Sequence, residues 1–353
     1  MSVAASWRPS LSGPTRYDEL VLPAGVPRVT LGEGGTPIVS AGMAQLKCDH
    51  LNPTGSYKDR IAAVGISVGA AAGATGWVGT SSGNAGAAFA AYGARAGLQG
   101  RLVTVDGVVP EKLGQVLAFG VDVCEVDGFG LRPEVEARVF AAVQEVAVAQ
   151  GLVLGITAHA YNRVAMAGVK TIAYELVEQL GRPPGVVYVP TGGGGLLTSV
   201  WDGFVEWRQL GLANRVPRIV AVQPAGCAPI HAAAIADSAT VSSIPESRSS
   251  ISGLQLTNPP DGDAALAAVR ASRGWTVAVE DESAFAAQRV LAEMYGVFVE
   301  PAAAAAYAGY LQQPAEDAVI LLTGSGLKTL GERRDDVARK RLAIEEIAAW
   351  ATS

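Results

Sequence analysis

The sequence has few residues of the kinds that bind metals or form disulfides. Its 353 residues include three cysteines and three histidines, namely Cys48, Cys124, Cys227, His50, His159 and His231. The cysteines lie far apart and form no CxxC pair, which argues against a zinc knuckle and a disulfide framework. We therefore expect no metal site, unclustered histidines and the reduced thiols usual in the cytoplasm.

Charge and long apolar runs are also scarce. Charged residues make up 17% of the chain, the net charge is -6 and no basic stripe is present, so a nucleic acid is not an expected partner. The N-terminus lacks a basic segment followed by an apolar one, which predicts no signal peptide. The apolar stretch 64–74 is too short to span a bilayer. With 49% hydrophobic residues, the chain instead predicts a globular cytoplasmic protein with no membrane partner.

Short β-branched runs alternate with alanine-rich stretches along most of the chain. The expected strands are 77–80, 101–105, 121–126, 152–157, 186–189, 219–223 and 318–323, and the expected helices include 85–96, 110–119, 164–180 and 283–295. This alternation predicts an α/β fold of two open, mostly parallel sheets with helices on both faces, in three-layer αβα domains. Ligands in such folds bind where strands end and helices begin.

The first candidate site segment is 51–60, with the sequence LNPTGSYKDR. Its Asn-Pro-Thr-Gly predicts a turn, and Ser56 is a candidate cap for the helix that follows. Lys58 would then lie in the first helical turn, where the helix dipole and partial burial disfavour an ammonium group. A neutral amine is suited to Schiff-base chemistry. A surface lysine after a turn has the same local pattern.

Three other segments lie at expected strand ends. TSSGNAG, residues 80–86, opens a helix whose N–H groups could bind a carboxylate, and Asn84 adds an amide. PTGGGGL, residues 190–196, has four glycines whose N–H groups could converge on one phosphate. LTGSGLK, residues 322–328, contains Thr323, whose hydroxyl could meet a ring nitrogen. Each segment alone is also compatible with an ordinary turn, but together they predict one ligand site.

The glycine run does not follow the known nucleotide patterns. The last position of GxGxxG falls on Leu197 or Thr198, and the GK[ST] ending of a P-loop is missing. A monophosphate ligand therefore fits better than a nucleotide, which disfavours a nucleotide-binding Rossmann protein.

These segments, in the same order, resemble those of the fold-type II pyridoxal phosphate (PLP) enzymes, the tryptophan synthase β-like family, and most of all its threonine synthase branch. LGEGGTP at 31–37 resembles that branch's LGEGNTPL, and LNPTGSYKDR resembles its lysine motif, with Tyr57 in place of the usual phenylalanine. TSSGNAG resembles its asparagine loop, GVFVEPA at 296–302 its GxxxEPA segment, and TGSGLK its TGHGLK ending. The resemblance runs from about Leu31 to Lys328.

The resemblance implies how the cofactor is held. Lys58 would carry PLP as a Schiff base and later move the substrate's α-proton. Asn84 would hydrogen-bond the phenolic oxygen, and Thr323 would meet the pyridine nitrogen. The cofactor phosphate would bind four consecutive residues, Gly192, Gly193, Gly194 and Gly195. A hydroxyl does not keep the ring nitrogen protonated as a carboxylate would, which suits loss of a leaving group from the β or γ carbon.

The resemblance also implies a substrate site and a division into domains. Ser81, Ser82 and Gly83 would receive the substrate carboxylate, and Glu300 is either a site residue or a buried, paired structural one. Residues 1–30 are expected to form an arm over the surface, and the charged tail from Gly331 a solvated helix. Residues 31–70 and 161–353 would form a larger PLP-binding domain and 71–160 a smaller mobile one, with the active site between them in a homodimer.

Two departures from the pattern leave the reaction open. GGGG replaces the GNAGN-type loop of threonine synthases and looks more like that of serine/threonine dehydratases. In the NPxRxxGxK segment, Asn162 is followed directly by Arg163, and the usual arginine position is Ala165. Asn162 and Arg163 remain the candidates for binding a substrate phosphate.

Three reactions or roles follow as alternatives. The first is a threonine synthase-like lyase in amino-acid biosynthesis, which acts on O-phosphohomoserine. The second is a serine/threonine dehydratase or a β-replacement synthase on an activated serine. The third is a PLP-fold protein that binds a ligand without turnover, against which Lys58, Asn84 and Thr323 argue.

Overall fold

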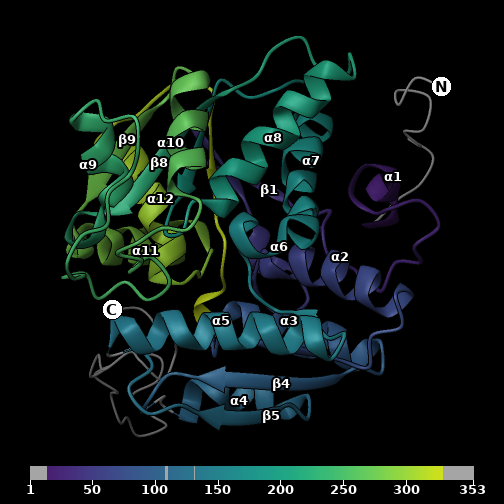
Figure 1. The fold of residues 1–353 in the computed structure, drawn as a ribbon. Helices are drawn as coiled ribbons and strands as arrows, with labels where there is room; N and C mark the ends of the chain where they lie inside the picture. Colours follow the sequence, from purple (N-terminus) through teal and green to yellow (C-terminus); the bar gives the residue numbers. More distant parts are fainter. Residues whose placement is uncertain (1–13, 108–109, 131, 329–353) are drawn as a thin grey trace, which may run out of the picture.

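The computed structural model describes residues 14–107, 110–130 and 132–328 (Figure 1). Its larger sheet contains β1 (Ile38–Ala41), β2 (Ala44–Lys47), β7 (Val186–Pro190), β8 (Arg218–Pro224), β9 (Trp275–Val279) and β10 (Ala318–Leu321), in the order β1-β2-β10-β7-β8-β9. Within this sheet β1 is antiparallel to β2, and the other described pairings are parallel.

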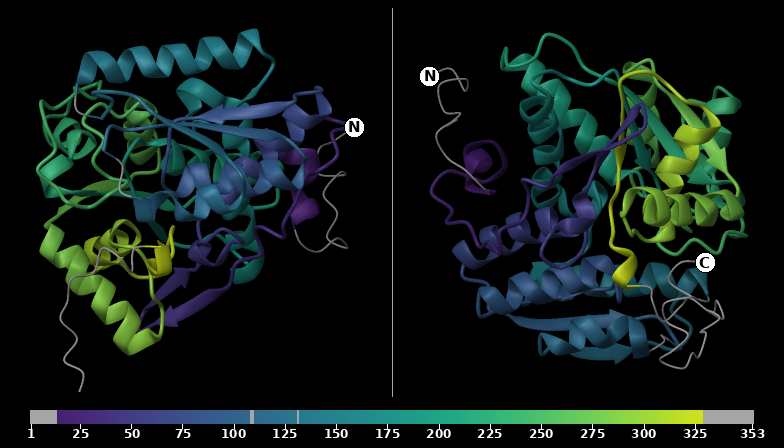
Figure 2. Two further views of the ribbon diagram at one scale, coloured as in Figure 1. Left: turned by 90° about the horizontal axis from the view of Figure 1, so that it is seen from below. Right: turned by 180° about the vertical axis from the view of Figure 1, so that it is seen from behind.

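The smaller sheet contains β3 (Gly76–Gly79), β4 (Gln99–Thr104), β5 (Asp122–Glu125) and β6 (Val153–Leu154). Its order is β5-β4-β3-β6, and its pairings are parallel. Trp77 of β3 packs against α3 (Asn84–Arg95), whereas its neighbour Val78 packs with Val139 and Val143 of α5 (Pro133–Ala149). Helices therefore cover both faces of this sheet, as Figure 2 also shows.

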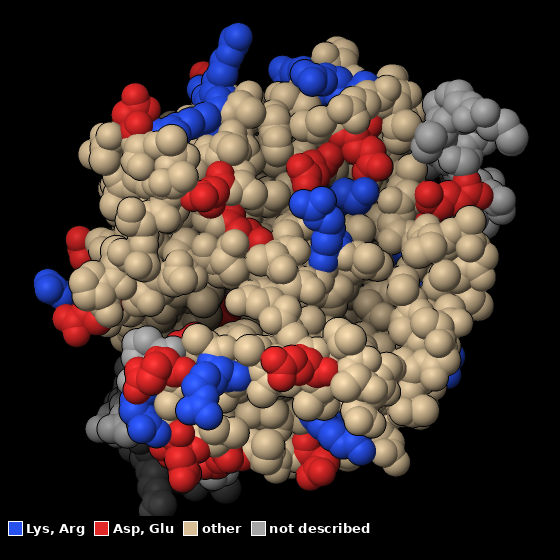
Figure 3. All heavy atoms as spheres, viewed as in Figure 1, with Lys and Arg blue, Asp and Glu red and all other residues tan. Residues whose placement is uncertain are grey.

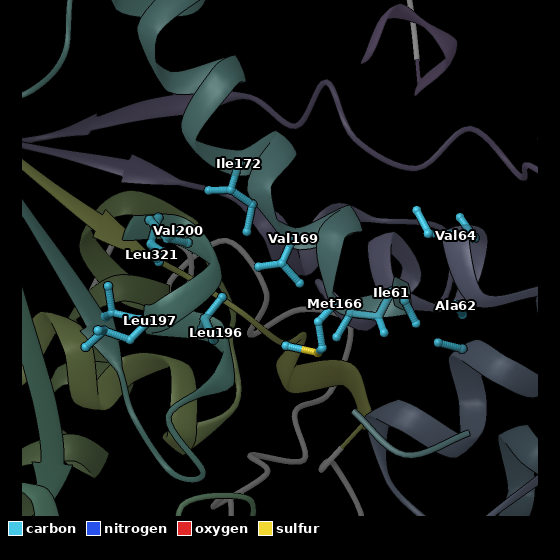
Figure 4. Close-up of a cluster of buried hydrophobic side chains, with 14 of the residues drawn as sticks. Ile61, Ala62, Val64, Met166, Val169, Ile172, Leu196, Leu197, Val200 and Leu321 are labelled. Carbon is cyan, nitrogen blue, oxygen red and sulfur yellow. The ribbon is translucent and has the colours of Figure 1, made fainter. Parts of the chain in front are cut away.

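Helices bury the larger sheet on both faces. Successive residues of its central strands point to opposite sides, and each side packs against a different set of helices. Val187 and Val189 join one apolar cluster with α2 (Lys58–Ala71), α7 (Thr171–Leu180), α8 (Gly195–Gln209), α9 (Pro229–Ile235) and α10 (Gly262–Ala271). Part of this cluster is drawn in Figure 4. Val186 and Tyr188 join a second cluster with α11 (Asp281–Tyr295) and α12 (Pro301–Gln312). The predicted class, two mostly parallel sheets with helices on both faces, is confirmed.

The element boundaries differ from the expectations at several points. Each expected strand exists, but the expected 152–157 is only the two-residue β6, and β1, β2 and β9 were not expected. The expected helix 164–180 is three pieces: α6 (His159–Met166), a 3-10 turn (Ala167–Lys170) and α7. Gly168 lies so close to α2 that a Cβ there would be 2.0 Å from the carbonyl oxygen of Arg60, and this tight packing coincides with the 3-10 turn. Helix α4 (Pro110–Ala118) was expected.

Ser56 is not the expected helix cap. The residue at the N-cap of α2 is Tyr57, and no side chain caps the helix. Ser56 is instead fully buried and pairs with Gly324 in an isolated antiparallel bridge. The bridge holds the start of α2 against the segment that follows β10, which brings Lys58 close to Thr323.

Residues 14–30, the described part of the expected N-terminal arm, do more than lie over the surface, because several of their side chains pack into the core. It contains the short helix α1 (Asp18–Val21), and Tyr17, Val21 and Leu22 are buried. The Tyr17 ring lies 5.3 Å from that of Tyr174 and 6.1 Å from that of Trp207. The tail from Gly331 lies outside the described residues.

The strands of the smaller sheet all fall within 71–160, and those of the larger sheet fall outside it. The expected division into two domains, and the mobility of the smaller one, remain predictions. None of the described helices has the length and apolar character needed to cross a membrane.

Candidate active site

A cavity of about 1980 Å³ lies at the carboxyl ends of strands from both sheets. The segments that follow β3, β6, β7 and β10 line it, as does the start of α2. Figure 3 shows the surface hollowed between the upper and lower parts of the molecule. The predicted site residues that line this cavity are Lys58, Ser81, Ser82, Gly83, Asn84, Gly192, Gly193, Gly194, Gly195 and Thr323. Asn162 and Arg163 are not among its lining residues.

Lys58 is the first residue of α2 and is only partly exposed. Its Nζ donates a hydrogen bond of 2.7 Å to Oγ1 of Thr157, in the segment after β6. The same Nζ lies 4.6 Å from the centre of the Tyr57 ring, within the range of a cation–π contact. These two contacts fix the direction of the amine across the cavity.

Protein atoms pack closely against the four-glycine segment, so that a side chain would not fit at several of its positions. Gly194 has a φ of 92°, and a Cβ there would lie 2.5 Å from the carbonyl oxygen of Asp261. A Cβ on Gly192 would lie 2.8 Å from the carbonyl oxygen of Gly253. Within the described chain, the N–H groups of Gly192 to Gly195 have no hydrogen-bond acceptor. They are therefore available to an anion at the start of α8.

Asn84 begins α3, and its Nδ2 lies 3.1 and 3.0 Å from the two carboxylate oxygens of Glu300. Glu300 precedes α12, and its carboxylate packs against Gly324, where a Cβ would lie only 2.2 Å from Oε1. Thr323 is 5% exposed and lines the cavity beside this contact. Glu300 is partly buried, pairs with a predicted site residue and lines the cavity, and its role as a site residue or a structural one remains a prediction.

An amine, a segment rich in free N–H donors and a buried hydroxyl thus surround one cavity. The family described as pyridoxal-phosphate dependent enzyme matches residues 29–324. The chain belongs to this family. Its cofactor is therefore pyridoxal phosphate.

Two curated relatives of this PLP enzyme are threonine synthases, which are lyases, so the protein is a PLP-dependent lyase. A threonine synthase of Synechocystis is 37% identical over 319 residues, with 86% of this chain and 79% of the relative covered. A threonine synthase of Mycobacterium bovis is 32% identical over 318 residues, with 85% and 83% covered.

Solved structures agree with the fold. A maize serine racemase superposes with a TM-score of 0.69 at 24% identity, over 84% of this chain and 90% of the other. A fungal L-serine ammonia-lyase from Rhizomucor miehei superposes with a TM-score of 0.68 at 22% identity, over 88% and 100%.

The residues of this PLP enzyme fit the cofactor's chemical groups. The glycine segment offers N–H donors and no side chain that would fill the space of a phosphate. Lys58 offers a primary amine for the aldehyde, and Thr323 offers a hydroxyl without charge for the ring.

Asn162 and Arg163 are not brought into the site. The amide of Asn162 is used by the backbone: Nδ2 donates to the carbonyl oxygen of Leu154 at 2.6 Å, and Oδ1 accepts from the N–H of Ala165 at 3.1 Å. These bonds hold Asn162 in a non-helical conformation inside α6. Arg163 is exposed. The expected role of these two residues in binding a substrate phosphate remains a prediction that the arrangement does not favour.

The structure adds cavity residues that sequence reasoning missed. Thr157 ends an expected strand, so its position was a usable signal. Asp261 had no such signal, since it lies in a long irregular segment. Lys328 ends TGSGLK, and its Nζ donates to the carbonyl oxygen of Thr54 at 3.0 Å. Burial lowers the pKa of Lys328, and Glu300 and Asp59 partly oppose this effect.

The three histidines lie apart, and the rings of two of them have different hydrogen-bond partners. His159 Nε2 lies 2.8 Å from Oγ of Ser199, and His231 Nδ1 lies 2.8 Å from Oγ1 of Thr276. His50 is buried, and burial lowers its pKa. Among the described residues, no three His, Cys, Asp or Glu side chains form a group that could hold a metal ion.

Asp59 stabilises the turn that leads to Lys58, and it makes folding depend on pH. Its carboxylate accepts hydrogen bonds from the N–H and Oγ1 of Thr54, and burial raises its pKa to about 6. The raised pKa means that the folded protein binds a proton more tightly than the unfolded chain. The stability that Asp59 contributes is thus fully present below about pH 4 and is lost as the pH rises through about 6.

We expect the stability of the wild type relative to Asp59→Asn to fall by about 2 to 3 kcal/mol between pH 4 and pH 7. The asparagine variant is the reference because it cannot ionise. Urea unfolding of both proteins at several pH values measures the difference. A stability difference that stays constant or grows with pH would contradict the assignment.

Proposed function

We propose that this PLP-dependent lyase is a threonine synthase, which converts O-phosphohomoserine and water to threonine and phosphate. The observation that carries the proposal is the single cavity that brings Lys58, the four-glycine segment, Asn84 and Thr323 together. The threonine synthases of Synechocystis and Mycobacterium bovis, similar over most of their lengths, support the choice of reaction.

We assign the holding of the cofactor to four parts of the cavity. The N–H groups of Gly192 to Gly195 bind its phosphate at the positive end of α8. Lys58 Nζ binds its aldehyde carbon. Asn84 donates to its phenolic oxygen, and Glu300 orients the Asn84 amide. The Thr323 hydroxyl meets its ring nitrogen. When bound, the cofactor supplies an electron sink for the pair released at the substrate's α-carbon.

The substrate is held and deprotonated by this chain's own residues. The carboxylate binds at the start of α3, where the N–H groups of Ser81, Ser82 and Gly83 have no acceptor within the described residues. A Cβ at Gly86 would lie 1.9 Å from the carbonyl oxygen of Ser81, so the close turn depends on this glycine. Lys58 Nζ removes the α-proton and later returns a proton to carbon, and Thr157 Oγ1 keeps it directed at the cavity.

A dehydratase acting on serine or threonine is the second candidate, with β-replacement on an activated serine as a variant of it. A specific observation favours this alternative. Asn162 and Arg163, the expected holders of a substrate phosphate, do not line the cavity. A substrate without a phosphate would not need them.

One assay separates the candidates. The purified enzyme is offered O-phosphohomoserine, threonine, serine and O-acetylserine separately, and inorganic phosphate, threonine and 2-oxo acids are measured. We expect phosphate and threonine from O-phosphohomoserine without a 2-oxo acid. A 2-oxo acid formed from threonine would overturn this in favour of the dehydratase, and no product from any of the four would contradict both.

We also propose that the enzyme is a cytoplasmic homodimer with a mobile smaller domain at 71–160. The three cysteines, all unpaired, suit a reducing compartment. Light scattering coupled to size-exclusion chromatography tests the dimer, for which the expected mass is twice 36.1 kDa.

A further inference from the structure

Asp261 connects two walls of the cavity. It is 6% exposed, and within the described residues no lysine or arginine forms an ion pair with it. Its carboxylate instead accepts backbone N–H groups at the start of α6. Oδ2 accepts from His159 at 2.8 Å, and Oδ1 accepts from Ala160 at 3.0 Å. The N-cap residue of α6 is Ala158, which has no side-chain acceptor, so Asp261 caps the helix from about a hundred residues away.

The backbone of Asp261 holds the four-glycine segment. Its N–H donates to the carbonyl oxygen of Gly193 at 2.9 Å. Its carbonyl oxygen lies against Gly194, and its Oδ2 lies 2.7 Å from where a Cβ on Gly195 would be. The same carbonyl accepts the N–H of Ala265, which fixes Asp261 to the start of α10. The residue is therefore anchored on a helix while it contacts three consecutive glycines.

The segment capped by Asp261 also positions the lysine. Thr157, which accepts the hydrogen bond from Lys58 Nζ, lies two residues before His159. A continuous path thus runs from the glycine segment through Asp261 to the start of α6, and from there to Lys58. A cofactor bound by its phosphate and its aldehyde touches both ends of this path.

We propose that Asp261 is a positioning residue that sets the place of the phosphate-binding glycines relative to Lys58. The inference rests on the glycine and lysine roles proposed above, but not on which amino acid is the substrate. The carboxylate does not repel the cofactor phosphate strongly, because two N–H groups and the positive end of α6 compensate its charge.

The test measures cofactor binding to the apoprotein without any amino-acid substrate, so failure of the threonine synthase proposal would not affect it. Asp261→Ala is expected to weaken binding of PLP, and of inorganic phosphate as its competitor, by about tenfold or more, because the glycine segment loses its support. Asp261→Asn keeps one acceptor oxygen and should lie between alanine and wild type. Pyridoxal, which lacks the phosphate, should lose less affinity than PLP.

Asp263→Ala is the matched control. Asp263 lies in the first turn of α10, two residues after Asp261, and is exposed. Within the described residues its side chain accepts one hydrogen bond, from the N–H of Val241 at 2.7 Å. The Asp263→Ala protein should bind PLP with the same affinity as the wild type. If Asp261 only caps α6, Asp261→Ala would lower the melting temperature of the apoprotein and leave its affinity for PLP unchanged. That result would overturn the proposal. Tighter binding of phosphate by Asp261→Ala would also overturn it.

Hydrogen exchange on the wild-type apoprotein gives a test that needs no variant. Inorganic phosphate should slow exchange at the N–H groups of Gly193 to Gly195 and also at His159 and Ala160, because Asp261 links the two segments. Protection confined to the glycine segment would contradict the link.

Discussion

Replacing Lys58 with alanine is expected to reduce threonine formation by about 10³-fold or more, because one amine both attaches the cofactor and moves the α-proton. Its Nζ is directed into the cavity by Thr157 and the Tyr57 ring, and this placement suits both tasks. The measurement is threonine released from O-phosphohomoserine at saturating PLP. Borohydride reduction of the wild type followed by mass spectrometry should locate the cofactor on Lys58.

Lys170→Ala is the control for this prediction. Lys170 pairs with Glu206 at 2.8 Å and does not line the cavity, so its removal should leave turnover close to that of the wild type. A Lys58→Ala protein that still forms threonine at a comparable rate would show that another group carries the proton.

Replacing Arg60 with methionine is expected to destabilise the protein by about 3 to 5 kcal/mol. Arg60 is 2% exposed and makes two-pronged contacts with both Asp49 and Glu175, at 2.6 to 2.8 Å. Lys47, fully buried, also contacts Glu175 at 2.6 Å. The variant leaves two buried carboxylates with one cation. Urea unfolding at neutral pH measures the loss.

Arg182→Met provides the matched comparison for Arg60. Arg182 pairs with Asp317, but its side chain is 57% exposed, so the pair is solvated and its loss should destabilise the protein much less than the loss of Arg60. Equal losses from the two variants would contradict the view that burial makes the Arg60 network decisive. Because Arg60 lies two residues after Lys58 on α2, we expect the Arg60 variant also to weaken PLP binding.

The buried ion pairs of Arg60 explain the role of LGEGGTP, a motif that the sequence could only match to a family. Within LGEGGTP, the N–H of Gly35 donates to Oε1 of Glu175 at 2.8 Å, and Oγ1 of Thr36 donates to Asp49 at 2.6 Å. The motif therefore packs on the Arg60 network, and none of its residues lines the cavity. Its glycine and threonine residues help to hold α2, which carries Lys58, in place.

Much of the fold was predictable because strands buried on both faces give continuous apolar runs. β7 and β8 were found for this reason. β1 was missed because it is a short, partly exposed strand at the edge of the sheet, and β2 because its four residues, AQLK, alternate between apolar and polar and form no continuous apolar run. The prediction of a single helix over 164–180 was wrong, because a 3-10 turn interrupts it. Gly168 packs closely against α2 at this turn, and no local sequence pattern reveals that contact.

The sequence by itself determined the family, the cofactor and the strand ends at which ligand groups lie. It could do so because glycine runs and polar residues after apolar strands are local patterns. The partners of those residues were decided only by the tertiary structure. Thr157 meets Lys58 across 99 positions, Glu300 meets Asn84 across 216, and Asp261 meets His159 across 102. Such contacts depend on how two sheets and their helices pack, and no spacing along the chain encodes them.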